Sequence, residues 1–88
     1  EQAREKGLVN RVVDAEQLDT EVEALATRIA AKPRVALALG KALFYRQLEE
    51  GIEAAYTDAG RTMACNMMDE SALEGVQAFI EKRKPDWR

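Results

Sequence analysis

Apolar residues recur at helical spacing along most of the chain and predict four successive helices. The first of these runs over residues 14–32, where steps of three and four residues align the apolar side chains on one face. Its apolar stripe consists of Leu18, Val22, Leu25, Ala26 and Ile29. Asp14 followed by Gln17 fits a capping box at its start. Lys32-Pro33 breaks the pattern, and Pro33 suits the first position of a new helix.

Three more helices are expected after this break. The helix over residues 33–48 is apolar on several faces, which indicates that other structure covers it from more than one side. After a turn at residues 48–51, a helix to about residue 67 carries the stripe Ile52, Ala55, Tyr56, Ala59, Met63 and Met67. Asp69 and Ser71 are helix-capping types, and they start a fourth helix that we expect to run through Arg83 and to stop before Pro85.

The N-terminal residues read as the end of one element followed by an extended segment. Residues 1–6 have the pattern of a helix end, with Gly7 as its C-terminal stop. Residues 8–13, LVNRVV, are β-branched and short, and they predict one strand or extended segment. A lone strand lacks a partner for its backbone hydrogen bonds. The sequence therefore predicts a mainly α fold, and we expect an upstream part that this stretch lacks.

Charge and hydropathy exclude two classes of partner. The 88 residues suffice for one small domain, and the net charge is −3. Residues 79–88 carry four basic and two acidic side chains, whereas residues 1–78 carry nine basic and fourteen acidic ones. An acidic body without a basic helix face argues against a nucleic-acid partner, including a helix-turn-helix reader. No apolar run has the length that spans a bilayer, so we expect no membrane partner.

The residue types leave little room for catalysis within these 88 residues. There is no histidine, and the single cysteine, Cys65, lies among apolar neighbours and is expected in the core. Without a neighbouring base, neither Ser71 nor Cys65 is an activated nucleophile. The acidic clusters Glu49, Glu50, Glu53 and Asp69, Glu70, Glu74 suit helix N-termini better than paired acid–base catalysis. We therefore predict no catalytic residue, no metal site and no tightly bound cofactor.

Three glycines, Gly40, Gly60 and Gly75, fall inside predicted helices. Each costs the helix about 1 kcal/mol relative to alanine. Two interpretations are equally open. Either another backbone or a ligand approaches closely at these positions, or the helices tolerate a weak residue there.

The basic tail also has two interpretations. Lys82, Arg83 and Lys84 close the last predicted helix, where cations complement the helix dipole. Alternatively, a cation one helical turn from an aromatic ring forms a site for a phosphate and a base. Phe79 and Lys82 have that spacing and would share one helix face.

Several segments resemble the enoyl-CoA hydratase/isomerase (crotonase) superfamily. AREKGLVNRVV, at residues 3–13, is similar to the segment that follows the catalytic core of that family. ALGKALFYRQL and EGVQAFIEKRKPDW are similar to its C-terminal helices, and the pattern EG-x-x-AF-x-EKR-x-P-x-W is the most specific part. The resemblance covers essentially all 88 residues, but only about the last third of a family chain.

This resemblance implies that residues 1–88 form the C-terminal helical, trimerisation domain of a crotonase-type fold, without the N-terminal catalytic core. The implied parent is an enoyl-CoA hydratase or isomerase that takes a coenzyme A thioester as substrate and assembles as a trimer or a dimer of trimers. It also implies that Phe79 and Lys82 lie near the adenine and the 3′-phosphate of coenzyme A. The expected location is the cytoplasm, or the mitochondrial matrix in a eukaryote. The isolated chain is expected to be inactive.

A second hypothesis belongs to a different class. A free-standing helical interaction module without enzymatic activity would bury the same apolar helix in a partner. The reading frame upstream of Glu1 distinguishes the two hypotheses. A glycine-rich segment of domain length there favours the enzyme, and a start codon immediately before Glu1 favours the module.

Overall fold

The computed structural model describes residues 1–87, and helices are its only regular elements. They are α1 (Gln2–Glu5), the 3-10 helix η1 (Ala15–Gln17), α2 (Leu18–Ala30), α3 (Arg34–Gln47), α4 (Ile52–Met67) and α5 (Glu70–Glu81). No strand forms within residues 1–87. The prediction of a mainly α chain with four principal helices after an N-terminal extended segment is therefore confirmed.

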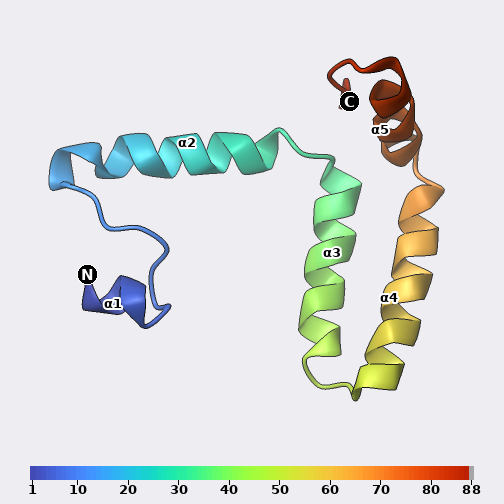
Figure 1. The fold of residues 1–88 in the computed structure, drawn as a ribbon, viewed down its shortest axis with the longest axis horizontal. Helices are drawn as coiled ribbons and strands as arrows, with labels where there is room; N and C mark the ends of the chain where they lie inside the picture. The colour runs from blue at the N-terminus through green and yellow to red at the C-terminus, as the bar shows by residue number, and fades with distance from the viewer. Residues whose placement is uncertain (88) are drawn as a thin grey trace.

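The N-terminal arm ends its short helix as predicted. Gly7 has a φ of +78°, and the amides of Gly7 and Leu8 donate to the carbonyls of Arg4 and Ala3 at 3.1 and 2.9 Å. This pair of bonds is a Schellman stop, which requires the left-handed conformation that glycine adopts without strain. Residues 8–13 then run as an irregular segment beneath α2 (Figure 1).

Two predicted helix starts are wrong in detail. Asp14 makes no capping bond with its side chain, because the chain first forms η1 and the Gln17 amide donates to the Asp14 carbonyl at 2.9 Å. Helix α2 therefore begins at Leu18. Pro33 is the N-cap of α3 and not its first residue, since its ψ of 125° is extended. Its carbonyl still accepts the first helical bond, from Leu37 at 3.1 Å.

Helices α3 and α4 form an antiparallel hairpin, and α5 packs beside the far end of α4 (Figure 1). A bidentate ion pair links the two arms of the hairpin, with Arg46 Nε and Nη2 donating to the Asp58 carboxylate at 3.1 and 3.0 Å. Arg46 Nη2 also donates to Thr62 Oγ1 at 3.3 Å. The hydrogen bond from Arg46 lowers the pKa of Asp58 below its ordinary value. Asp58 is therefore an ionised structural partner of Arg46.

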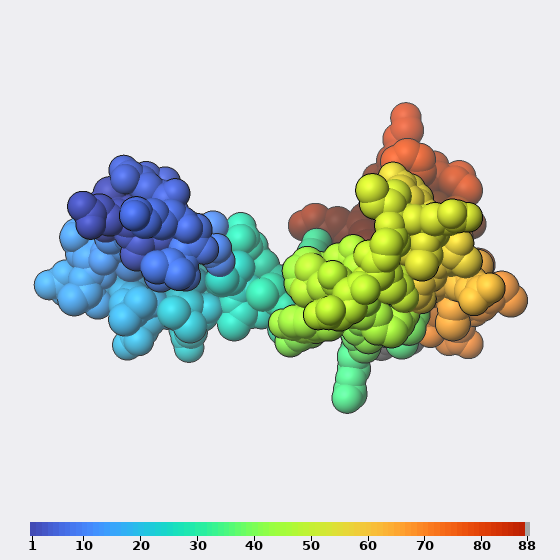
Figure 2. Space-filling view, turned by 90° about the horizontal axis from the view of Figure 1, so that it is seen from below, coloured from blue at the N-terminus to red at the C-terminus, as the bar shows by residue number. Residues whose placement is uncertain are grey.

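The chain encloses almost no core of its own. Its radius of gyration is 17.1 Å, whereas a compact domain of this length would have about 12 Å. Ala78 is the one fully buried residue among residues 1–87. Figure 2 shows the N-terminal arm with α2 on one side and the α3–α4 hairpin on the other, joined by a narrow bridge. The helices thus hold their apolar faces open.

Most predicted stripe residues are exposed for this reason. Ile52 is 79% exposed and Tyr56 is 78% exposed. An open, largely apolar groove of about 400 Å³ runs along the hairpin and is lined by Gly40, Leu43, Phe44, Gln47, Ala55, Tyr56 and Ala59. The prediction that Cys65 is a core residue is wrong, because nothing in the described chain covers its face of α4.

The helices show no membrane-spanning character. None of those within residues 1–87 combines the length and the apolarity that crossing a bilayer requires.

The open apolar faces predict that residues 1–88 alone self-associate or fold poorly, because exposed apolar patches beyond a few hundred Å² usually mark an interface. Sedimentation equilibrium over a range of concentrations should show dimers or larger species. Replacing Tyr56 by serine should reduce the association, whereas Lys41→Arg should leave it unchanged. A well-folded, strictly monomeric species at high concentration would contradict the prediction.

Candidate functional site

The candidate site lies at the C-terminal end of α5, and a specific cap fixes where that helix begins. Asp69 is its N-cap, and one of its carboxylate oxygens accepts from the Ser71 amide at 2.9 Å and from the Ser71 hydroxyl at 2.5 Å. The hydroxyl bond, followed by the amide bond, lowers the pKa of Asp69. An ionised carboxylate at this end also complements the helix dipole.

The other end of α5 differs from the prediction. The helix stops at Glu81, and Lys82 has φ 54° and ψ 40°, which is left-handed. The amides of Lys82 and Arg83 donate to the carbonyls of Phe79 and Ala78 at 3.3 and 3.0 Å. These two bonds form a second Schellman stop, with lysine in the place where Gly7 closes α1. Among residues 1–87, Lys82 is the one residue other than glycine with positive φ.

This stop changes the relation between the two predicted site residues. Phe79 and Lys82 do not share a helix face by periodicity, because Lys82 lies outside the helix. They are instead joined through the backbone bond from the Lys82 amide to the Phe79 carbonyl. The Phe79 side chain is 84% exposed, and Lys82 is exposed as well. The ring and the ammonium therefore lie at one open end of α5.

Arg83 has a different role from the lysines beside it. Its Nη1 and Nη2 donate to the two Glu74 oxygens at 2.6 and 3.1 Å, and its Nε donates to Glu81. Its Nη1 also donates to the Lys84 carbonyl at 3.2 Å. The carboxylates of Glu74 and Glu81 raise the pKa of Arg83. Within residues 1–87, Lys82 and Lys84 form no ion pair, so these two cations are available to an anion.

The tail folds back along α5 beyond this point. The Asp86 amide donates to Glu74 Oε1 at 2.8 Å. The ring of Trp87 lies over Gly75, where an added Cβ would stand 3.0 Å from Trp87 Cη2. Close approach is therefore the reason for glycine at position 75. Around Gly40 and Gly60 the same added atom would meet nothing within 4 Å.

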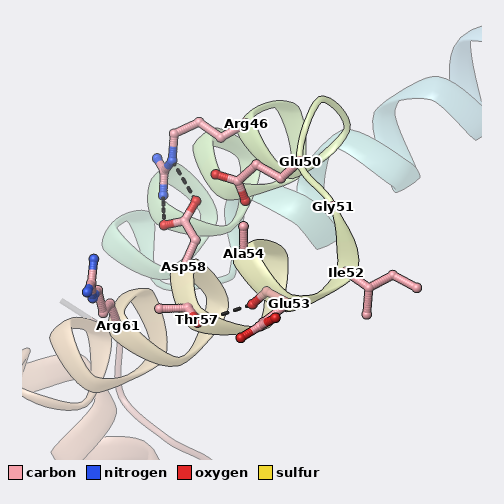
Figure 3. A pocket seen from close by; sticks show the side chains of 9 residues that line it. All are labelled: Arg46, Glu50, Gly51, Ile52, Glu53, Ala54, Thr57, Asp58 and Arg61. Carbon is pink, nitrogen blue, oxygen red and sulfur yellow. Dashed lines mark hydrogen bonds and ion pairs between the residues drawn. The ribbon is translucent and has the colours of Figure 1, made fainter.

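The first acidic cluster lies at the turn of the hairpin, around an open hollow of about 880 Å³ (Figure 3). Glu50 and Glu53 line it together with the Arg46–Asp58 pair. A general acid needs a raised pKa, whereas that of Asp58 is lowered. The Ile52 side chain, also part of the lining, points away from the Arg46–Asp58 pair in Figure 3. The arrangement is that of charged groups around a helix N-terminus, as predicted.

The second acidic cluster is also structural. Asp69 caps α5, Glu74 holds Arg83 and the Asp86 amide, and Glu70 lies in the first turn. The Ser71 hydroxyl donates to the Asp69 carboxylate, whose lowered pKa makes it a weak base. No group of three metal-ligating side chains that could hold an ion occurs in residues 1–87.

Sequence reasoning named Glu74 and Gly75, but it missed that they arrange the tail together with Trp87. Glu74 and Arg83 are nine residues apart, a separation that places them together only because the chain reverses at Lys82. The one local signal is a glycine inside an otherwise good helix, twelve residues before a tryptophan.

Comparison with known proteins places this arrangement in a family. The family model described as Enoyl-CoA hydratase/isomerase matches residues 1–88. Among curated proteins, the chain is 41% identical over 87 residues to the mouse (Mus musculus) protein "Enoyl-CoA hydratase domain-containing protein 3, mitochondrial". It is 35% identical over 81 residues to "Crotonyl-CoA hydratase" of Syntrophomonas wolfei.

Solved structures agree with these matches. An enoyl-CoA hydratase of Mycobacterium smegmatis superimposes with a TM-score of 0.94 at 66% identity, covering 98% of this chain and 34% of that one. The human enoyl coenzyme A hydratase domain-containing protein 3 superimposes with a TM-score of 0.87 at 38% identity, covering 92% of this chain and 32% of that one.

The match covers nearly all of this chain but a minority of each relative. It takes in 99% of the chain and 29% of the mouse protein, and 92% of the chain and 31% of the Syntrophomonas protein. The chain thus spans about a third of the length of the relatives that it matches.

The left-handed stop at Lys82 predicts an unusual effect on stability. Glycine at this position should raise the free energy of unfolding of the whole protein by about 1 kcal/mol, because a side chain in this conformation costs roughly that amount. Alanine should give no such gain, since its Cβ meets the same hindrance. Urea unfolding of the two variants would measure the difference.

Lys84→Gly is the matched control for this experiment. Its backbone has no positive φ, so glycine there should bring no stabilisation. Equal effects of glycine at positions 82 and 84 would contradict the assignment of strain to Lys82.

Proposed function

The chain belongs to the enoyl-CoA hydratase/isomerase (crotonase) family, and we propose from this that its 88 residues are the C-terminal helical domain of an acyl-CoA-processing enzyme. The proposed reaction is the addition of water to a trans-2-enoyl-CoA. Two observations support hydration over isomerisation: the names "Crotonyl-CoA hydratase" and "Probable enoyl-CoA hydratase" among the curated relatives. In this proposal the domain supports oligomerisation and borders the coenzyme A site.

The single observation that carries the binding role is the open end of α5. Phe79 is 84% exposed beside a lysine that forms no ion pair with any residue of the described chain. An ammonium group binds a phosphate by a charge-assisted hydrogen bond, and an aromatic ring packs on a purine. We therefore assign Lys82 to the 3′-phosphate of coenzyme A and Phe79 to its adenine.

The chemistry of the reaction requires groups beyond this domain. Hydration of an enoyl thioester needs hydrogen-bond donors for the negative charge that develops on the carbonyl oxygen, and a carboxylate that activates the water. In the second cluster Asp69 already caps α5 and Glu74 pairs with Arg83, and Glu53 and Glu70 lie in the first turns of α4 and α5. We place the catalytic groups in an N-terminal core.

The same core and neighbouring subunits would cover the apolar helix faces. Side chains such as Phe44, Tyr56 and Met63 are 55%, 78% and 63% exposed, which supports a homo-oligomer, a trimer or a dimer of trimers. The free-standing interaction module is the second candidate, because the same exposed faces would also dock on a different protein. A core-length reading frame upstream of Glu1 would reject the module.

Residues 1–88 alone should show no hydratase activity, because the proposal places the donors for the thioester oxygen and the base that activates water in the N-terminal core. The test incubates the purified chain with crotonyl-CoA and follows the loss of enoyl absorbance. Turnover above a buffer control that survives rigorous purification would reject the proposal that the catalytic groups lie in an N-terminal core.

In the whole protein, Lys82→Ala should raise KM for the enoyl-CoA several-fold with little change in kcat. An exposed lysine–phosphate contact contributes on the order of 1 kcal/mol and is equally strong in the ground and transition states. The effect should shrink with a 3′-dephospho-CoA thioester and with added salt.

Lys82→Gly serves as a second variant, since it also removes the ammonium but relieves the backbone strain. Both variants should lose the same affinity. An equal effect of Lys82→Ala on the CoA and dephospho-CoA thioesters would reject the phosphate role.

A further inference from the structure

Glu74 stabilises the left-handed stop at Lys82, although the two residues are about two helical turns apart in the sequence. Its carboxylate accepts two bonds from Arg83 and one from the Asp86 amide. Glu81 accepts a further bond from Arg83, and Gln77 Nε2 donates to it at 2.6 Å. We call Glu74, Arg83 and the Asp86 amide the tail clamp.

The tail clamp acts on a strained residue. Lys82 is the one residue other than glycine with positive φ in the described chain, and such a conformation persists only where the surroundings over-determine it. Arg83 immediately follows Lys82, and its amide is bound to the Ala78 carbonyl while its guanidinium is bound to Glu74. Ala78 is the buried point of α5. The backbone of Lys82 is thus fixed from the C-terminal side by the clamp.

We propose that Glu74 is a positioning residue for the anion-binding lysine: through Arg83 it sets the left-handed turn that directs Lys82 toward the phosphate. The inference rests on the proposed function of Lys82. It assigns Arg83 to the architecture of the site and not to the ligand, because its guanidinium is already engaged by two carboxylates. Preorganisation of this kind increases affinity by reducing the ordering that binding requires.

The charge of Glu74 and its role in the tail clamp predict opposite effects on anion binding when this residue is changed. Removing a negative charge near an anion site should strengthen anion binding. If the tail clamp positions Lys82, Glu74→Gln should instead weaken anion binding, since a neutral amide cannot form a bidentate ion pair with the Arg83 guanidinium. Arg83→Lys is a second variant that keeps the positive charge but loses the fork geometry.

The test measures dissociation constants for coenzyme A and 3′-dephospho-CoA by calorimetry on the whole protein. Because Glu74 and Arg83 act through Lys82, neither variant should lose more than Lys82→Ala does. We expect Glu74→Gln and Arg83→Lys to weaken coenzyme A by roughly two- to fivefold and to leave 3′-dephospho-CoA unchanged. In the Lys82→Ala background, neither should weaken coenzyme A further.

Glu70→Gln is the matched control, since it removes the same charge from the first turn of the same helix without contacting Arg83. It should leave coenzyme A binding unchanged or slightly tighter. Native-state trypsin cleavage after Lys82 and Arg83 reports the clamp directly. Release of the peptide that contains Trp87 should be faster in Glu74→Gln than in wild type and Glu70→Gln.

The outcomes separate the two levels of the proposal. If Lys82→Ala weakens both ligands equally or neither, the phosphate role fails and the positioning role falls with it. If Lys82→Ala is selective for the 3′-phosphate but Glu74→Gln is not, the positioning role alone is overturned. Tail release at the wild-type rate in Glu74→Gln would overturn the clamp itself.

Discussion

Burial of apolar surface is the largest favourable contribution to folding, and this chain achieves little of it within itself. Its helices meet mainly where α3 packs on α4 and where α4 packs on α5, and full burial is reached at Ala78. Every other feature follows from this constraint. The helices stand apart, their stripes face outward, and the radius of gyration is 17.1 Å.

Polar interactions define the fine structure where a core is lacking. Arg46 and Asp58 connect the arms of the hairpin, Asp69 starts α5, and the Glu74–Arg83 pair returns the tail along it. Such contacts are directional but individually weak in water. They set the geometry of the C-terminal end, whereas the stability of the domain depends on covering its apolar faces.

The helices could be predicted from the sequence because their apolar stripes repeat every three to four residues. The way in which the helices begin and end could not be predicted. Asp14 and Gln17 have the types of a capping box, yet a 3-10 turn forms between them. Cys65 looks apolar enough for a core, but no part of the described chain covers it. Periodicity describes a helix face and not what lies against that face.

The residues of the candidate site come from a sequence motif and stay a prediction, whereas the backbone geometry at that site could not be predicted. The motif around Phe79 and Lys82 was visible, whereas the left-handed turn between Glu81 and Arg83 was not, because lysine rarely occupies it. The tail clamp depends on that turn. Since Glu74 and Arg83 are nine residues apart, their contact has no local signature in the sequence.

The packing of Trp87 on Gly75 bears on how this domain could be engineered for heat resistance. Replacing helical glycines by alanine is a common route to stabilisation, because it lowers the conformational freedom of the unfolded chain. Gly40 and Gly60 have room for the added methyl group within this chain, but at Gly75 that group would press on the indole. A design that treated the three glycines alike would displace the tail while improving the helix that carries it.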